Sequence, residues 1–267
     1  MIELGALLGR ALVSGDDAPV RAELVQHSGL PGARLNLRLV ATFAHAVGEV
    51  ARRPDPPVAA LEALLDRWAA MPERQAPVDR PEVILPCAAV AAYGEVGAVR
   101  PDWWDDEVAK LGDAATDGRW RVREVVALAL QRLLDADWDR TARVLVDWAA
   151  ADDPLVVRAA AAAVAEPPLL RSEDRWASAA GVQRRAVERL HAYPTQARGT
   201  PRVRVLRQTL GFTISVVVAA TGDFALLEDL AACGDPDLRW VVRENLKKSR
   251  LQRWPSRLDH VRALLDP

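Results

Sequence analysis

One six-residue sequence motif occurs at two distant places in the chain, and this repetition limits its possible folds more than any other feature. The phrase Arg-Trp-x-Val-Arg-Glu occurs at residues 119–124 and again at residues 239–244. A phrase that returns after more than a hundred residues is typical of a repeat architecture, in which equivalent helices of different repeats share a local sequence. Further copies of the same signal are therefore expected elsewhere in the chain.

Related segments do recur along the sequence. One pattern, in which an Asp and a short spacer precede Val-Arg and an apolar helical stretch, occurs at 117–133, 153–164 and 235–246. Weaker copies of it lie at 31–47, 80–97 and 200–217. Aligned on the Arg or its equivalent, the anchors fall near residues 38, 84, 123, 158, 204 and 243, so the spacings are 46, 39, 35, 46 and 39. Each interval is long enough for two helices with short turns. We therefore predict about six helical hairpins.

Local signals place the individual helices. An Asp or Thr before proline, at Asp153, Thr200 and Asp235, predicts a capped helix start, because the side-chain oxygen accepts a backbone N–H and proline has none to leave unpaired. Preceding helices are predicted from apolar spacing at 56–71, 103–115, 138–150, 182–193 and 223–233. The segment 1–17 is predicted as an amphipathic helix, 166–176 as an irregular connection and 253–267 as a capping helix. No strand is predicted.

The composition agrees with a helical protein that works without a metal or a cofactor. There are nine Trp but only two Tyr and three Phe, so the aromatic enrichment of β-sheets is missing. Cys87 and Cys233 form neither a metal-type spacing nor a disulfide framework, which indicates a reducing cytoplasm. The longest apolar run, 211–220, is too short to cross a bilayer. A soluble, cytoplasmic protein without a membrane association is therefore expected.

The Asp-to-Arg start on every second helix, in units of 35–46 residues, resembles HEAT repeats. The resemblance implies an all-α fold, a right-handed α-solenoid of about six HEAT-like helical-hairpin repeats with a C-terminal capping helix. It implies one domain over 1–267, with weak repeats in 1–116, clear repeats in 117–250 and the capping helix in 251–267. Second helices of the repeats would line the concave side. The stretch 235–251 is similar to the C-terminal repeat of bacterial HEAT-like proteins, which include DNA-alkylation-repeat glycosylases.

The charges are distributed unevenly. Residues 1–117 hold 11 Lys and Arg against 18 Asp and Glu, whereas residues 198–267 hold 12 against 8. This pattern indicates either a basic working surface or ordinary solvated helix faces. If second helices line a groove, its cations would bind phosphates. The residues predicted to bind nucleic acid or another partner are Trp120, Arg121, Arg123, Arg158, Arg204, Arg207, Trp240, Arg243, Lys247 and Lys248. Arg119 and Arg239 would also face this groove.

Two functions follow, and the sequence leaves both open. The first is a monomeric binding protein for duplex DNA, extended by the resemblance to an alkylpurine-DNA glycosylase-like repair protein. In that version Glu124 or Glu244 would be the catalytic carboxylate that stabilises charge on the sugar, beside a Trp that holds a cationic base. The second is a non-enzymatic protein–protein interaction scaffold.

Each residue predicted for the site also has a structural interpretation. The motif arginines of HEAT repeats form a ladder with acidic residues, and such a ladder would pair Arg123, Arg158 and Arg243 with Asp117, Asp153 and Asp235. The two Trp side chains would then pack between repeats. Each of the two Glu side chains would pair with a neighbouring Arg or Lys.

Overall fold

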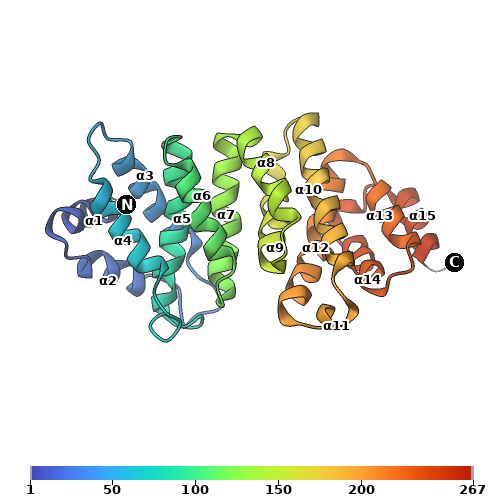
Figure 1. Cartoon of the computed structure of the whole chain (residues 1–267), viewed down its shortest axis with the longest axis horizontal. Coiled ribbons are helices and arrows are strands. Elements are labelled where there is room, and N and C mark those ends of the chain that lie inside the picture. The colour runs from blue at the N-terminus through green and yellow to red at the C-terminus, as the bar shows by residue number, and fades with distance from the viewer. Residues whose placement is uncertain (1, 266–267) are drawn as a thin grey trace. The chain divides into compact units, whose positions relative to one another are not determined.

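The computed structural model describes residues 2–265, and every regular element in that range is a helix (Figure 1). The predicted all-α class is therefore confirmed. The helices of the first half are α1 (Ile2–Ser14), α2 (Ala18–Gln26), α3 (Leu37–Ala51), α4 (Val58–Ala69), η1 (Pro81–Val83), α5 (Ile84–Val99), α6 (Trp104–Ala115) and α7 (Trp120–Ala136). Those of the second half are α8 (Trp138–Ala149), α9 (Pro154–Ala163), η2 (Pro167–Leu169), α10 (Glu173–Ala192), α11 (Thr195–Arg198), α12 (Pro201–Thr221), α13 (Ala225–Ala232), α14 (Pro236–Leu246), η3 (Ser249–Leu251) and α15 (Pro255–Leu265).

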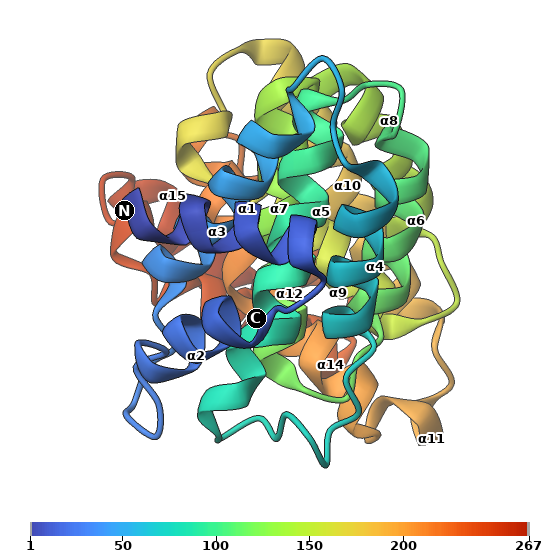
Figure 2. The same cartoon turned by 90° about the vertical axis from the view of Figure 1, so that its left-hand side faces the viewer.

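The contacts within the chain divide it into two compact units. Unit 1 comprises Met1–Asp137 and unit 2 comprises Trp138–Pro267. In unit 1, α5 packs between α3 and α7 in one layer, while α4 and α6 pack against α5 in a second layer. The helices α1 and α2 close the N-terminal end against α3, α4 and α5 (Figure 2). Unit 1 is thus a two-layer stack of helical hairpins.

Unit 2 has the same kind of layering. Its long helix α12 packs between α9 and α14, and the second layer is formed by α8, α10 and α13. The last helix, α15, covers α13. The capping helix predicted for 253–267 is therefore present, as Pro255–Leu265.

The repeat anchors predict the second helix of each hairpin correctly. Helices α3, α5, α7, α9, α12 and α14 each contain or begin at one of the six anchors. Two local predictions were wrong. Thr200 precedes α12 but makes no capping bond, because its hydroxyl donates to the Ala197 carbonyl at 2.7 Å instead. The segment 166–176 is not irregular throughout, since Ser172 caps α10, which begins at Glu173.

Two segments have the length and apolarity of a membrane span, namely 81–99 and 201–221. In both, most of the apolar window is buried inside the structure, 78% for the first and 61% for the second. Core helices of soluble proteins pass the same test of length and composition. The two segments are therefore the central core helices of their units, which is compatible with a soluble protein.

Candidate functional site

The residues predicted for the site are divided between the two units. Four of them, Trp120, Arg121, Arg123 and Glu124, lie at the start of α7 in unit 1. Trp120 is 49% exposed, and the Arg121 guanidinium carbon lies 4.3 Å from the centre of its ring. Arg121 itself is buried and its Nε donates to the Val78 carbonyl at 2.9 Å. This places Arg121 in the packing of unit 1 rather than on an open surface.

The neighbouring arginines of α7 also serve the fold. Arg119 is 5% exposed, and it binds the Asp117 carboxylate at 2.6 Å and the Ala76 carbonyl at 3.4 Å. Arg123 donates to the backbone carbonyls of Asp117 and Gly118 at 2.6 and 2.8 Å. The Asp117 carboxylate thus forms an ion pair with Arg119. These bonds fix the loop between α6 and α7.

The other predicted residues lie in unit 2, with Arg158 on α9 and the rest on α12, on α14 or directly after α14. A Cβ atom on Gly211 of α12 would lie 3.2 Å from both the Trp240 ring and the Glu244 Cβ atom, so α14 lies directly on this glycine. The Arg207 guanidinium carbon lies 4.7 Å from the centre of the Trp240 ring, and Arg207 also forms an ion pair with Asp237. Trp240 is therefore half-buried between helices, as the packing interpretation predicted.

Several carboxylates of unit 2 have basic partners. Glu244, a predicted catalytic residue, pairs with Lys247 at 2.5 Å. Asp235 caps α14 and pairs with Arg198 at 2.5 Å. Asp153 caps α9 and pairs with Arg202. Ion pairs therefore link helices of neighbouring hairpins, through arginines that the sequence did not single out.

Several cations of unit 2 make no ion pair within residues 2–265, among them Arg204, Lys248, Arg250 and Arg253. Arg204 donates to the Gly199 carbonyl at 3.2 Å, and Arg253 donates to the Ala219 carbonyl. Arg243 on α14 and Lys247 directly after it are exposed as well. We call these six cations, which lie on α12, on α14 and in the segment after α14, the basic face of unit 2. An excess of cations on a surface attracts polyanions.

A cleft of about 800 Å³ adjoins the basic face. Its lining consists of Ala165, Glu166, Pro167, Leu170, Phe212, Val216, Ala219, Ala220, Ser249, Arg250 and Arg253. Phe212 is 41% exposed, although it lies inside the apolar run 211–220. The sequence did not predict this cleft, because nothing in an unbroken apolar run shows that one of its residues, Phe212, is exposed to solvent. We call it the Phe212 cleft.

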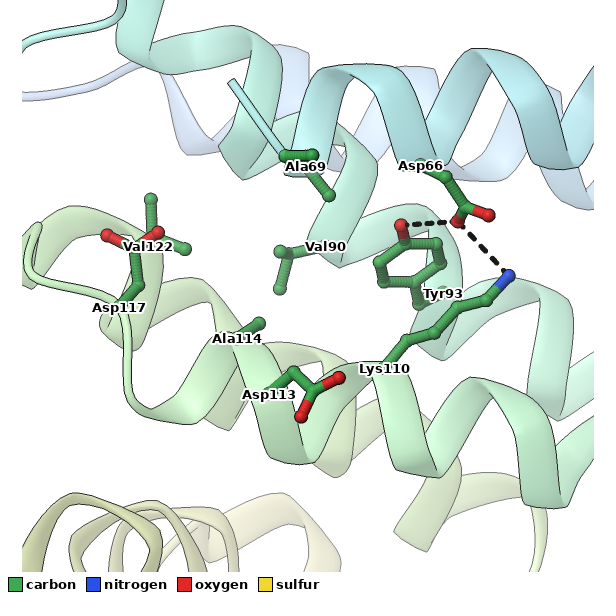
Figure 3. Close-up of a pocket in the computed structure, with 10 residues that line it drawn as sticks. Asp66, Ala69, Val90, Tyr93, Lys110, Asp113, Ala114, Asp117 and Val122 are labelled. Carbon is green, nitrogen blue, oxygen red and sulfur yellow. Dashed lines mark hydrogen bonds and ion pairs between the residues drawn. The ribbon is translucent and has the colours of Figure 1, made fainter. Parts of the chain in front are cut away.

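Unit 1 contains a different cleft, of about 350 Å³, between α4 and α6 (Figure 3). Asp66 accepts a hydrogen bond from the Tyr93 hydroxyl at 2.8 Å and pairs with Lys110 at 3.2 Å. Asp113 also lines the cleft, and it makes no ion pair among the residues that the structure describes. Apolar side chains such as Val90 form the floor. This cleft is acidic at its rim and apolar at its base.

Glu107 lies next to this cleft and is the most deeply buried carboxyl group of α6. It is 2% exposed, and its Oε2 atom has no hydrogen-bond partner among the described atoms. Burial raises its pKa to about 7; Lys110 opposes the shift, and the Asp66 and Glu62 carboxylates add to it. A buried carboxyl group of this kind binds a proton near neutral pH.

Glu107 is expected to make unit 1 less stable as the pH rises from about 4.5 to about 7. The folded state holds the proton over that range while the unfolded state releases it, so each pH unit lowers the free energy of unfolding by about 1.4 kcal/mol at most. Urea unfolding at pH 5 and pH 7.5 measures this, with Glu107→Gln as the comparison. The stability of the variant relative to the wild type should increase with pH. A constant difference between the two proteins would contradict the assignment.

No group of three or more His, Cys, Asp or Glu side chains that could hold a metal ion occurs in the described part of the chain. In comparisons with known proteins, no family model and no curated protein matches the sequence. The candidate sites of this all-helical protein are therefore defined by its own geometry: a basic face with an adjoining cleft in unit 2, and an acidic cleft in unit 1.

Proposed function

We propose that the protein binds DNA through the basic face of unit 2. The observation that carries the proposal is that four cations of the basic face, Arg204, Lys248, Arg250 and Arg253, make no ion pair within residues 2–265. Arg204 lies eight residues before Phe212 on α12, which corresponds to about 12 Å along a helix. These cations come from α12 and from the segment after α14, so they are distributed over two parts of unit 2. Such a surface suits a phosphate backbone, whose charges repeat along a line.

The charge of unit 2 supports the same function. It carries 20 Lys and Arg against 16 Asp and Glu, although the whole chain has a net charge of −2. Many of its arginines are already engaged by carboxylates, as Arg198 is by Asp235. The remaining cations keep their attraction for an external anion. Binding would release counterions from DNA and therefore weaken as salt concentration rises.

The double variant Lys248→Glu/Arg250→Glu is expected to weaken duplex DNA binding about tenfold or more and to reduce the salt slope of log K by about 2. Neither side chain makes an ion pair within residues 2–265, so the fold should persist. Fluorescence anisotropy with a labelled duplex, at several salt concentrations, measures both quantities. Circular dichroism confirms that the variant is folded.

The matched control is Arg184→Glu/Arg185→Glu. These residues are exposed on α10, in the other layer of unit 2, and the change in net charge is the same. The control should bind DNA within about threefold of the wild type, because it leaves the cations of the basic face in place; its exposed ion pair between Arg184 and Asp229, at 3.4 Å, is lost at little cost in stability. Equal losses in both variants would show that no defined face binds DNA. If the wild type does not bind DNA at low salt, the proposal is wrong.

Fewer observations support the further proposal that the protein is a DNA glycosylase. Trp240 and Glu244 both lie against Gly211, so an aromatic ring and a carboxylate are close together. The pairing of Glu244 with Lys247 and of Trp240 with Arg207 favours binding over catalysis. Base release from a duplex with an N-alkylated purine tests the activity. Release that is lost in Glu244→Gln would add catalysis to the proposed DNA binding.

The acidic cleft of unit 1 favours a second candidate function, an interaction scaffold for a basic protein segment. Its apolar floor suits the aliphatic stem of a Lys or Arg side chain, and Asp113 suits the charged end. Anisotropy with a labelled Lys-rich peptide tests this function. Binding that is weakened by Asp113→Lys, without DNA binding, would favour the scaffold.

For the architecture, we propose one right-handed HEAT-like α-solenoid domain over 1–267, in a monomeric cytoplasmic protein. The same two-layer stack of helical hairpins in each unit supports this arrangement. The regular recurrence of the anchors at the second helices supports it as well. Small-angle X-ray scattering distinguishes an elongated monomer from two independently moving units.

A further inference from the structure

Phe212 is an exposed aromatic residue whose backbone is held firmly on both sides. The residue before it, Gly211, lies under Trp240 of α14. The residue after it, Thr213, is fully buried and donates from its hydroxyl to Gln183 of α10 at 2.9 Å. The Ser215 hydroxyl in turn donates to the Phe212 carbonyl at 2.7 Å. The ring is therefore presented to solvent by a rigid helix, which makes it a preformed platform.

The surroundings of the ring combine apolar surface with positive charge. The lining of the Phe212 cleft includes the apolar side chains of Leu170 and Val216 together with Arg250 and Arg253. Its volume of about 800 Å³ is in the range of small-molecule pockets. An occupant must therefore have a flat apolar body and carry negative charge. A nucleotide unit has both properties, because a base stacks on aromatic rings and its phosphate binds guanidinium groups.

Polar groups at the edge of the cleft suit a base in particular. Glu166 and Ser249 both line it. The Glu166 carboxylate makes no ion pair among residues 2–265, so its oxygens remain acceptors for the amino group of a base. In a duplex, the faces of the bases are covered by their neighbours and are not available for stacking on a protein side chain. Stacking on Phe212 would therefore require an unpaired base.

We propose that the Phe212 cleft binds one unpaired nucleobase of a DNA strand, stacked on Phe212, while Arg250 and Arg253 contact the adjoining phosphates. This inference rests on the proposed DNA binding by the basic face and adds a preference for single-stranded or locally unpaired DNA. The basic face supplies salt-sensitive attraction to any strand. The cleft supplies an attraction that depends on the presence of a base.

The test compares two labelled single strands of equal length by anisotropy, one of oligo(dT) and one in which the central nucleotides are abasic. Both strands have the same phosphates, so a difference in affinity reports the bases. The wild type should bind oligo(dT) about tenfold or more tightly than the abasic strand, as expected for one base on an aromatic ring. Phe212→Ala should remove this difference, whereas Phe212→Tyr should keep it. Leu128→Ala, which removes another exposed apolar side chain, should have no effect.

Each result separates this inference from the function on which it rests. Salt-sensitive binding of duplex and both single strands with equal affinity, unchanged in Phe212→Ala, would overturn the base site and leave the basic face intact. An equal loss on all three ligands in Phe212→Ala would also overturn it. If the wild type binds no DNA, both proposals fail. An equal-length RNA strand shows whether the cleft selects the sugar as well as the base.

Discussion

Replacing Asn245 with leucine is expected to lower the free energy of unfolding of unit 2 by about 3 kcal/mol. Asn245 is completely buried between α12 and α14. Its Nδ2 donates to the carbonyls of Leu210 and Val241, both at 2.8 Å, and its Oδ1 accepts from the Ser215 amide at 2.7 Å. Leucine has a similar size but no polar atoms. Backbone groups of α12 would therefore lose these partners inside the core, where water cannot replace them.

Urea unfolding of the whole chain measures the effect, and hydrogen exchange of the α12 and α14 amides shows where it occurs. Gln208→Leu provides a matched control, because it makes the same type of change at an exposed position of α12. The control should alter stability by less than about 0.5 kcal/mol. A similar small effect for Asn245→Leu would show that the bridge between the two helices is dispensable. The same bridge positions α14 beside Gly211, so the variant should also weaken DNA binding.

Replacing Gly94 with alanine should destabilise unit 1 by about 3 kcal/mol, which is large for one added methyl group. Gly94 lies in α5 where α7 crosses it. A Cβ atom there would lie 2.6 Å from the Ala129 carbonyl oxygen and 2.7 Å from the Ala129 Cα atom. These are backbone atoms, so relief requires the two helices to move apart. In a helix interior, alanine is normally about 1 kcal/mol more stabilising than glycine. If Gly94→Ala is less stable than the wild type, the loss must therefore come from the steric clash with α7.

Gly9→Ala is the control for helix propensity in the same unit. Gly9 lies in α1, and a Cβ atom on it would meet nothing within 4 Å. Its substitution should therefore leave stability unchanged or raise it by up to about 1 kcal/mol. The comparison uses urea unfolding and hydrogen exchange of the α5 and α7 amides. If both variants were stabilised equally, the close crossing of α5 and α7 would not exist in solution.

Local sequence signals predicted most of the helices. Asp153 and Asp235 cap their helices as expected, because the capping oxygen and the amides that it accepts lie within three residues of each other. The apolar spacing of 103–115 and 138–150 correctly predicted helices, which the structure has as α6 and α8. Thr200 does not cap α12, and its hydroxyl donates to the Ala197 carbonyl of the preceding turn instead. All of these predictions concern residues that are close together in the sequence.

The sequence by itself determined the helical class, the positions of the hairpins and the basic character of the C-terminal part. Only the tertiary structure decided which side chains remain available to a ligand. Arg121 is buried because it meets the Val78 carbonyl 43 residues earlier in the chain. Phe212 is exposed because its immediate neighbours pack on α10 and α14. Helix periodicity follows from bonds within a few residues, whereas exposure depends on contacts between helices that are far apart in sequence.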